Sequence, residues 1–304
     1  MSSPPLRFAG VELGGTKTLC GLAIGDRLVE TVTLPTTTPG ETLSAVSRQL
    51  DVWNDVAPLA GLGIASFGPV RVDPVAPDYG QILITPKQGW SGAPVLKLLG
   101  GDRRVPTAID TDVNAAAMAE YLWGAGQGCS SLVYLTIGTG LGGGVVINGQ
   151  PLHGRLHPEI GHILVRRSPG DRFPGACPFH RDCIEGLISG PALAARFGKP
   201  APYAAHDAPE WAFVARDFAQ LLATLILVLA PQRILIGGGV GLGVPQLLPL
   251  ALRALPEALA SYFPDVDAGR LALMIRLAGL GSSVGPLGAI VLAQRAAATA
   301  SCGL

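Results

Sequence analysis

The sequence predicts an α/β protein built from two related halves. Its 304 residues are enough for two domains of ordinary size. Patterns typical of strands alternate along the chain with patterns typical of helices, which favours an α/β fold. A Gly-rich turn followed by a tight hairpin turn also occurs twice, since Gly14 and Gly25 precede Gly138 and Gly149 by the same 124 positions.

In the first half, the strand-like segments RFAGVE and TLCGLAI flank the turn LGGTK, and LVETVTL follows the hairpin turn GDR. The segment GETLSAVSRQLDVWNDVA has the apolar spacing of a helix, and PLAGLGIASFGPV predicts a strand that ends in a Gly-Pro turn. Strong helix formers predict a helix over residues 113–123 that ends at Gly124. Asp110, Thr111 and Asp112 stand just before it, where N-caps occur.

In the second half, LVYLTI and GVVI are predicted strands around the turn GTGLGG, and NGQ is the hairpin turn after them. A long helix is expected over residues 209–229, followed by a buried strand, RILIGGGVG, that runs into glycines. GTGLGG satisfies the G-x-G-x-x-G pattern of dinucleotide-binding proteins. That site needs a helix after the turn, and a strand follows here.

Charge and hydropathy exclude some partners. Lys plus Arg and Asp plus Glu both number 22, so nucleic acid and anionic membranes are not expected partners. The apolar stretch over residues 218–230 is too short to span a bilayer and predicts a buried helix. The first residues lack the pattern of a signal peptide, so the expected location is the cytoplasm.

Three Gly-rich segments, ELGGTK, IGTGLGGG and IGGGVG, are candidate phosphate-binding loops. Glycine lets backbone N–H groups approach a phosphate without a side chain in the way. Each segment alone is more consistent with a plain hairpin turn than with a phosphate site. Three of them in a duplicated architecture predict a nucleotide-binding cleft.

The segment CPFHRDC places Cys177, His180 and Cys183 within seven residues. Two thiolates and an imidazole suit tetrahedral Zn²⁺, although a fourth ligand is missing locally. A buried pair of free thiols and a redox pair are the alternatives. A disulfide is disfavoured because stable disulfides are rare in the cytoplasm.

Taken together, the segments GGTKT, TDVNAAAMAE, LTIGTGLGGG, HPEIGH with the cysteine cluster, and ILIGGG resemble the ROK family of sugar kinases, and they occur in that family's order over about residues 8–293. The resemblance implies a two-domain actin-like (ribonuclease H-like) ATPase fold with an interdomain active-site cleft. The expected first domain spans residues 1–113 plus 285–304. The expected second domain spans 114–284 and carries a loop pinned by zinc.

The segments YGQILITPKQGW and CPFHRDCIEGLISGPA are similar to the fructokinase branch in particular. Glu12 and Thr111 stand where the family's glucokinases usually have Asp and Asn, which also disfavours glucose. The resemblance therefore implies an ATP-dependent fructokinase that makes fructose 6-phosphate. Kinases of glucose, mannose or N-acetyl sugars are alternatives. A sugar-sensing regulator is an alternative of a different class, but its helix-turn-helix domain does not fit before Glu12. A sugar-binding protein without catalysis is a third alternative, although Asp112 and all three Gly-rich loops are present.

The resemblance also assigns roles to residues. Asp112 becomes the base that accepts the sugar hydroxyl proton, although its position alone would favour a helix cap.

The implied partners are a hexose, ATP with Mg²⁺, and a second copy in a homodimer. Glu12 is expected to hold Mg²⁺ through water, and Lys17 to lie near the phosphates. The implied sugar site contains Thr111, Asp112, Glu159, His162 and Glu185. For Glu159 and Glu185, the alternative is that they are surface charges with no ligand. The implied nucleotide site contains Glu12, Gly14, Gly15, Thr16, Lys17, Gly138, Thr139, Gly140, Pro191, Gly237, Gly238 and Gly239. The implied structural Zn²⁺ ligands are His162, Cys177, His180 and Cys183.

Overall fold

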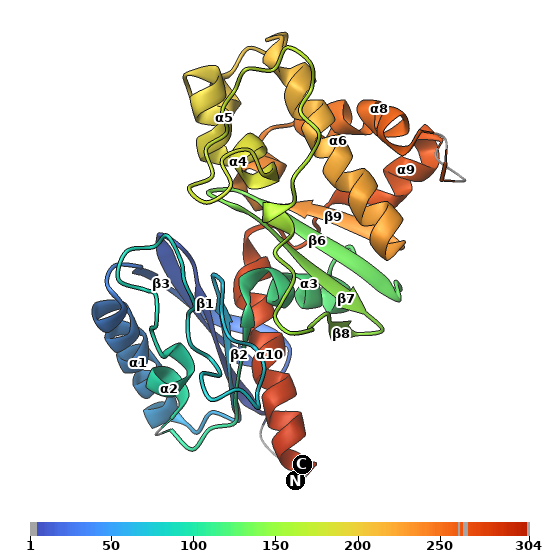
Figure 1. Cartoon of the computed structure of the whole chain (residues 1–304). Helices are drawn as coiled ribbons and strands as arrows, with labels where there is room; N and C mark the ends of the chain where they lie inside the picture. The colour runs from blue at the N-terminus through green and yellow to red at the C-terminus, as the bar shows by residue number, and fades with distance from the viewer. Residues whose placement is uncertain (1–4, 102, 261, 264–266, 303–304) are drawn as a thin grey trace. The chain divides into compact units, whose positions relative to one another are not determined.

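The computed structural model describes residues 5–101, 103–260, 262–263 and 267–302. The chain divides into two α/β units, each organised around one sheet (Figure 1). The first unit contains the chain up to Trp123, the segment Gln150–His157 and the chain from Leu280 onward. The second unit contains Gly124–Gly149 and Pro158–Gly279.

The sheet of the first unit has the strand order β3-β2-β1-β4-β5. Its strands are β1 (Arg7–Leu13), β2 (Lys17–Ile24), β3 (Arg27–Pro35), β4 (Gly61–Ser66) and β5 (Thr107–Thr111). β1 pairs with β2 in antiparallel fashion and with β4 in parallel fashion. The antiparallel pair forms the predicted hairpin around the turn at residues 14–16. The short strand β8 (Gln150–Pro151) lies in the returning segment of this unit.

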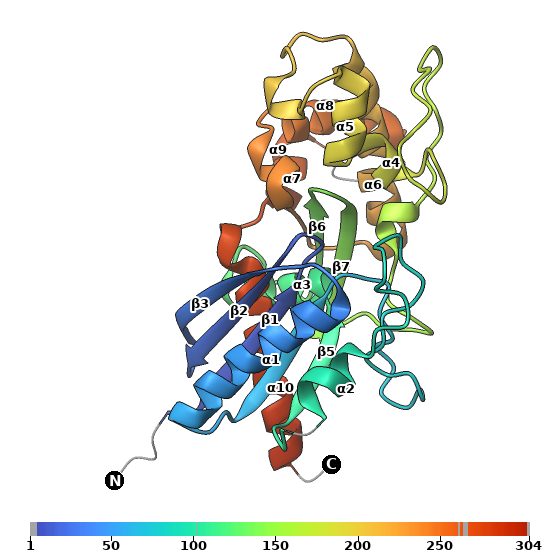
Figure 2. The same ribbon diagram turned by 90° about the vertical axis from the view of Figure 1, so that its left-hand side faces the viewer.

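Helices cover both faces of this sheet (Figures 1 and 2). They are α1 (Pro39–Val56) and α2 (Val95–Gly100) on one face, and α3 (Asp112–Trp123) and α10 (Val284–Ser301) on the other. Alternation along β1 explains the two layers, because successive strand residues point to opposite faces. Val11 and Leu13 pack in one apolar cluster with Leu50 of α1. Phe8 packs in another with Ile290 of α10.

Helix α10 approaches the sheet so closely that only glycine fits beneath it. A Cβ added at Gly63 of β4 would lie 1.9 Å from the carbonyl oxygen of Ala289, and one added at Gly10 would lie 2.8 Å from the Ala289 Cβ. The start of the same helix reaches the end of β1, because a Cβ at Gly285 would lie 2.0 Å from the Glu12 carboxyl group. The C-terminal helix thus positions a predicted site residue of the first unit.

The sheet of the second unit repeats this arrangement. In order it contains β10 (Ile275–Leu277), β9 (Arg233–Gly237), β6 (Ser131–Ile137), β7 (Leu141–Ile147) and the short strand β8. β6 pairs with β7 in antiparallel fashion and with β9 in parallel fashion, as β1 does with β2 and β4. The predicted use of one hairpin twice is confirmed.

The helices of the second unit are α4 (Ile184–Ile188), α5 (Gly190–Phe197), α6 (Glu210–Leu229), α7 (Gly238–Gly243), α8 (Leu247–Leu259) and α9 (Ala268–Met274). The long helix predicted over residues 209–229 is α6, which packs against α8 and α4. Among the described helices, α6 is the one long and apolar enough to cross a membrane, and 56% of its most apolar window is buried inside the protein. Its apolar surface is therefore that expected of a core helix.

The structure differs from the sequence predictions in three places. The glycines after β9 begin the short helix α7 instead of a loop, and β7 starts at Leu141, which leaves a shorter turn than GTGLGG. The compact units also do not divide at residue 113, since α3 packs against α10 and stays with the first unit. Residues 1–4, 102 and 303–304 of the expected first domain lie outside the described residues.

Candidate active site and metal centre

The turn between β1 and β2 presents open backbone in the first unit. The Gly14 N–H donates to the Lys17 carbonyl oxygen at 3.1 Å, and a Cβ at Gly14 would lie 2.6 Å from that oxygen. The turn therefore needs glycine at position 14. A Cβ at Gly15 would meet nothing within 4 Å, so space lies open beside the backbone there. This combination of a tight turn and open space suits a bound phosphate.

Glu12 lies at the end of β1, just before this turn, and its carboxyl group packs against Gly285. Burial raises the pKa of Glu12, and the nearby Lys17 ammonium partly offsets that effect. A carboxylate and an ammonium thus stand together at one end of the sheet. A hydrated divalent cation would favour the charged form of Glu12, because an opposite charge stabilises a carboxylate.

Asp112 is the first residue of α3, where a capping role and a catalytic role compete. The Asn114 N–H donates to the Thr111 hydroxyl oxygen at 3.1 Å, so Thr111 caps the helix. The Asp112 carboxylate accepts the N–H of the adjacent Val113 at 2.9 Å. Since Thr111 supplies the cap, the cap alone does not account for an aspartate at position 112.

Thr111 itself is 2% exposed, and its hydroxyl group is engaged in the cap. The predicted sugar contact by this residue stays a prediction, because a buried capping hydroxyl supports the helix first. Thr111 and Asp112 thus differ in exposure although they are neighbours, since Asp112 is only half-buried.

A buried polar cluster supports the start of α3, and sequence reasoning missed it. Asp110 is 3% exposed, and one of its carboxylate oxygens accepts from the Thr111 N–H at 2.7 Å and from the Asn114 side-chain amide at 2.8 Å. Its other oxygen lies 2.9 Å from Nε2 of His153. This hydrogen bond raises the pKa of His153, against the opposing effect of burial. His153 lies 43 positions from Asp110, and nothing in its local sequence indicates the pair.

In the second unit, the predicted nucleotide-binding residues of the turn between β6 and β7, of the start of α5 and of the start of α7 lie close together. The Gly138 N–H donates to the Gly140 carbonyl oxygen at 2.9 Å, which closes the turn between β6 and β7. The Gly190 N–H, at the start of α5, donates to the Gly138 carbonyl oxygen at 2.7 Å. A Cβ at Gly138 would lie 3.8 Å from the backbone nitrogen of Gly239. Pro191 follows directly in α5.

Two carboxylates border this turn. An oxygen of Glu185 accepts the Leu141 N–H at 3.0 Å, so this side chain braces the turn from α4. Burial, and then the charge of Glu185, raise the pKa of Glu159 to about 7. The two glutamates are thus close enough to influence each other. Glu159 is exposed and Glu185 is half-buried, and both side chains offer acceptors to a polyhydroxyl ligand.

Four predicted metal ligands converge in the same unit. The ligand atoms of His162, Cys177, His180 and Cys183 all lie within 4.8 Å of one another. Nδ1 of His162 lies 3.5 Å from Sγ of Cys183 and 3.8 Å from Sγ of Cys177, and Nδ1 of His180 lies 4.0 Å from the latter. Tetrahedral Zn²⁺ bonds imply sulfur-to-nitrogen separations of about 3.6 Å.

The donor set therefore fits a tetrahedral metal. Both thiols are free, so the disulfide alternative does not describe this structure. His162 comes from the short 3₁₀ turn Ile160–His162, and the other three ligands from the loop that leads into α4. A metal here would join two segments that otherwise lack regular secondary structure.

Comparison with known proteins gives a consistent result. Residues 8–296 match the model of the ROK family. A fructokinase from Zymomonas mobilis is 41% identical over 95% of this chain and 97% of its own length, and a fructokinase from Pediococcus pentosaceus is 38% identical over 95% and 98%. The crystal structure of a ROK family glucokinase from Streptomyces griseus, in complex with glucose and AMPPNP, is 26% identical, with a TM-score of 0.74 over 95% of this chain and 99% of that one.

Proposed function

Because this chain belongs to the ROK family of sugar kinases and has their actin-like fold, we propose that it is an ATP-dependent fructokinase that converts fructose to fructose 6-phosphate. The observation that carries the choice of sugar is its similarity to fructokinases at 38 and 41% identity over nearly full length. The glucokinase that matches in structure is 26% identical. Glucose, mannose and N-acetyl sugars are the less supported alternatives within the same class.

Asp112 acts as the general base in this proposal. It accepts the proton of the sugar hydroxyl as that oxygen attacks the γ-phosphorus, and the bond to the β-phosphate oxygen breaks. This role is supported by the contacts at the start of α3, where Thr111 caps the helix and Asp112 is therefore not needed as the cap. Asp110, held by His153 and Asn114, keeps the preceding backbone in place.

The remaining groups are assigned by their neighbours. The N–H groups of Gly14, Gly138 and Gly190 close the two turns, so we assign the phosphates to the neighbouring backbone N–H groups, those of Gly15, Thr16, Thr139 and Gly239, with Gly237 alongside. Glu12 would hold Mg²⁺ through water, and the bound Mg²⁺ would neutralise charge on the phosphates. Glu159 and Glu185 accept hydrogen bonds from the sugar hydroxyls, and His162, whose Nδ1 faces the metal site, donates its Nε2–H to a sugar oxygen.

Structural Zn²⁺ at His162, Cys177, His180 and Cys183 is part of the proposal, supported by the donor set and its spacing. Its role is to fix the loop before α4, and so the positions of Glu159 and Glu185, because outer groups orient the residues that touch a ligand. A homodimer and a cytoplasmic location are proposed from family resemblance alone.

A coupled assay of ADP release tests the function. Wild-type protein with ATP and Mg²⁺ is assayed against fructose, glucose, mannose and N-acetylglucosamine at several concentrations. We expect the highest kcat/KM for fructose. A clear preference for glucose or an N-acetyl sugar would identify that sugar, and not fructose, as the substrate. Turnover of no sugar would favour the different-class alternative, a sensor that binds without catalysis.

A further inference from the structure

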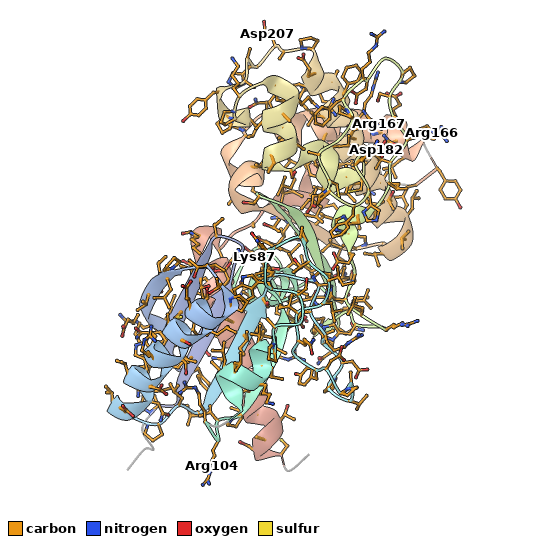
Figure 3. The ribbon with its side chains drawn as sticks, turned by 60° about the vertical axis from the view of Figure 1, so that its left-hand side comes forward. Lys87, Arg104, Arg166, Arg167, Asp182 and Asp207 are labelled. Carbon is orange, nitrogen blue, oxygen red and sulfur yellow. The ribbon has the colours of Figure 1, made fainter. Side chains whose placement is uncertain are left out.

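Lys87 occupies an ordered loop of the first unit that the mechanism above does not use (Figure 3). The Trp90 N–H donates to the Lys87 carbonyl oxygen at 3.1 Å, and the Trp90 indole N–H donates to the Thr37 carbonyl oxygen at 2.8 Å. Trp90 is fully buried. The backbone that carries Lys87 is therefore fixed to the core and to the start of α1, although it has no regular secondary structure.

The side chain of Lys87 reaches the turn between β1 and β2. Its ammonium group donates to the carbonyl oxygen of Gly15, 72 positions earlier in the chain. The same group lies 5.8 Å from the ring centre of Phe67 and 6.0 Å from that of Trp90. These two rings pack edge to face, with centres 5.1 Å apart. Cation–π attraction to both rings holds the ammonium in one place.

The charge of Lys87 is not balanced by a carboxylate. No ion pair to this lysine occurs in the part of the chain that the structure describes. An ammonium group has three N–H donors, and the Gly15 carbonyl oxygen takes one of them. Two donors and a full positive charge are thus left beside the open space at Gly15. An anion is the ligand that this arrangement suits.

We propose that Lys87 is a catalytic residue that binds the phosphoryl group in transfer, through its oxygens, at the turn around Gly15. This inference rests on the proposed kinase function and adds a residue to it. Phosphoryl transfer spreads negative charge over three equatorial oxygens, which a fixed cation stabilises. Lys87 keeps its proton throughout, because the hydroxyl proton goes to Asp112 and the broken bond leaves its electrons on ADP.

Lys17 was the cation expected from sequence, and the structure gives it a different neighbour. Its charge acts on Glu12, where it opposes the effect of burial on the carboxyl pKa. Lys87 faces no such carboxylate. Lys17 therefore balances the proposed magnesium-binding carboxylate, and Lys87 is the cation available to a phosphate.

The alternative is that Lys87 only supports the turn mechanically, through the Gly15 carbonyl oxygen. Three variants separate the two roles. Lys87→Met keeps the stem and removes the charge, and Lys87→Arg keeps the charge. Lys97→Met removes an exposed lysine of α2 in the same unit and serves as the control. For each, kcat, KM for fructose, KM for ATP and the melting temperature are measured, together with fructose 6-phosphate and fructose binding by calorimetry.

We expect Lys87→Met to lower kcat by about 10²-fold, the loss typical of removing one fixed donor from a developing charge. Binding of fructose 6-phosphate should weaken while binding of fructose and the melting temperature hold, and Lys87→Arg should recover part of the rate. Lys97→Met should match wild type. Three results would each overturn the proposal. They are an unchanged kcat in Lys87→Met, an equal loss of binding of fructose and of fructose 6-phosphate, and a lowered melting temperature that accounts for the lost rate. If wild type prefers another hexose, the proposal that fructose is the substrate is wrong, but the role of Lys87 is still open to test. The same variants are then assayed with that sugar and its 6-phosphate.

Discussion

The two Gly-rich hairpin turns share one scaffold and differ in what surrounds them. The turn after β1 has charged neighbours, Glu12, Lys17 and Lys87, and open space at Gly15. The turn after β6 is braced by backbone, through the Gly190 N–H and the close approach of Gly239. The difference indicates a division of work. On the proposed function, the first turn would bind the metal and the phosphate in transfer through charged side chains, and the second turn would bind the nucleotide through peptide groups.

Asp112→Asn should have the largest effect on activity, and it tests the charged side of this comparison. Asparagine keeps the shape but cannot accept the proton, and a positioned base contributes about 10²–10⁴-fold to rate. We expect kcat to fall by at least about 10²-fold. The melting temperature should be nearly unchanged, because Thr111 caps α3. An unfolded variant would identify Asp112 as structural. Wild-type turnover would move the base elsewhere, with Asp110 as the next residue to test.

Removal of the metal should destabilise the second unit. Protein purified without an affinity tag should contain about one zinc per chain, since bound structural zinc contributes folding free energy directly. Cys183→Ser should lose the metal and lower the melting temperature, while Cys302→Ser, at an exposed thiol, should not. Elemental analysis and thermal unfolding measure both. A zinc-free protein as stable as the untreated one would rule out a structural metal.

Alanine substitutions in the turns should separate folding from ligand binding. Gly14→Ala should lower the melting temperature, because the new Cβ would lie 2.6 Å from the Lys17 carbonyl oxygen. Gly15→Ala should leave the melting temperature almost unchanged and reduce kcat/KM, because its methyl group enters space where a phosphate would lie. In the second turn, Gly138→Ala should mainly raise KM for ATP. If Gly15→Ala retains full activity, that space is not used by a ligand.

The sequence predicted the parts of this fold that depend on local pattern. The two hairpins, α3 and α6 carry alternation or helical spacing within one segment, and each was placed within a few residues. The start of α7 was missed because a run of glycines has low helix propensity, and only the packing of the second unit makes it helical. The expected boundary at residue 113 does not match the compact units, because packing between distant segments also decides it: α3 packs on α10 and stays with the first unit.

The site residues also fall into two groups, those that local sequence spacing indicates and those that only the fold brings together. The metal ligands Cys177, His180 and Cys183 are adjacent in sequence, so their spacing indicated the cluster. The contacts of Lys87 with Gly15 and of His153 with Asp110 join positions 72 and 43 residues apart. No periodicity or spacing encodes such pairs. They arise from the loops that the fold brings to the ends of the strands.

His153→Gln should have the smallest effect, and it sharpens the role of the cluster behind Asp112. Because the Asp110 hydrogen bond raises the pKa of His153 in the folded state, the pair adds stability that is fully present below its unfolded pKa of about 6.5. That stability is lost as pH rises through the higher folded pKa. The melting temperature of wild type should therefore exceed that of the variant at acidic pH, and the difference should shrink as pH rises. A difference that is constant with pH would contradict a charged pair.

The central claim, that Asp112 and the charged turn transfer a phosphoryl group to fructose, is tested most directly by identifying the product. Wild type and Asp112→Asn are incubated with fructose, ATP and Mg²⁺, and the phosphorus NMR spectrum is followed with time. The account predicts that wild type forms fructose 6-phosphate and ADP in equal amounts, and that the variant forms almost none over the same period. Fructose 1-phosphate as the product, no sugar phosphate from wild type, or equal product from both proteins would contradict it.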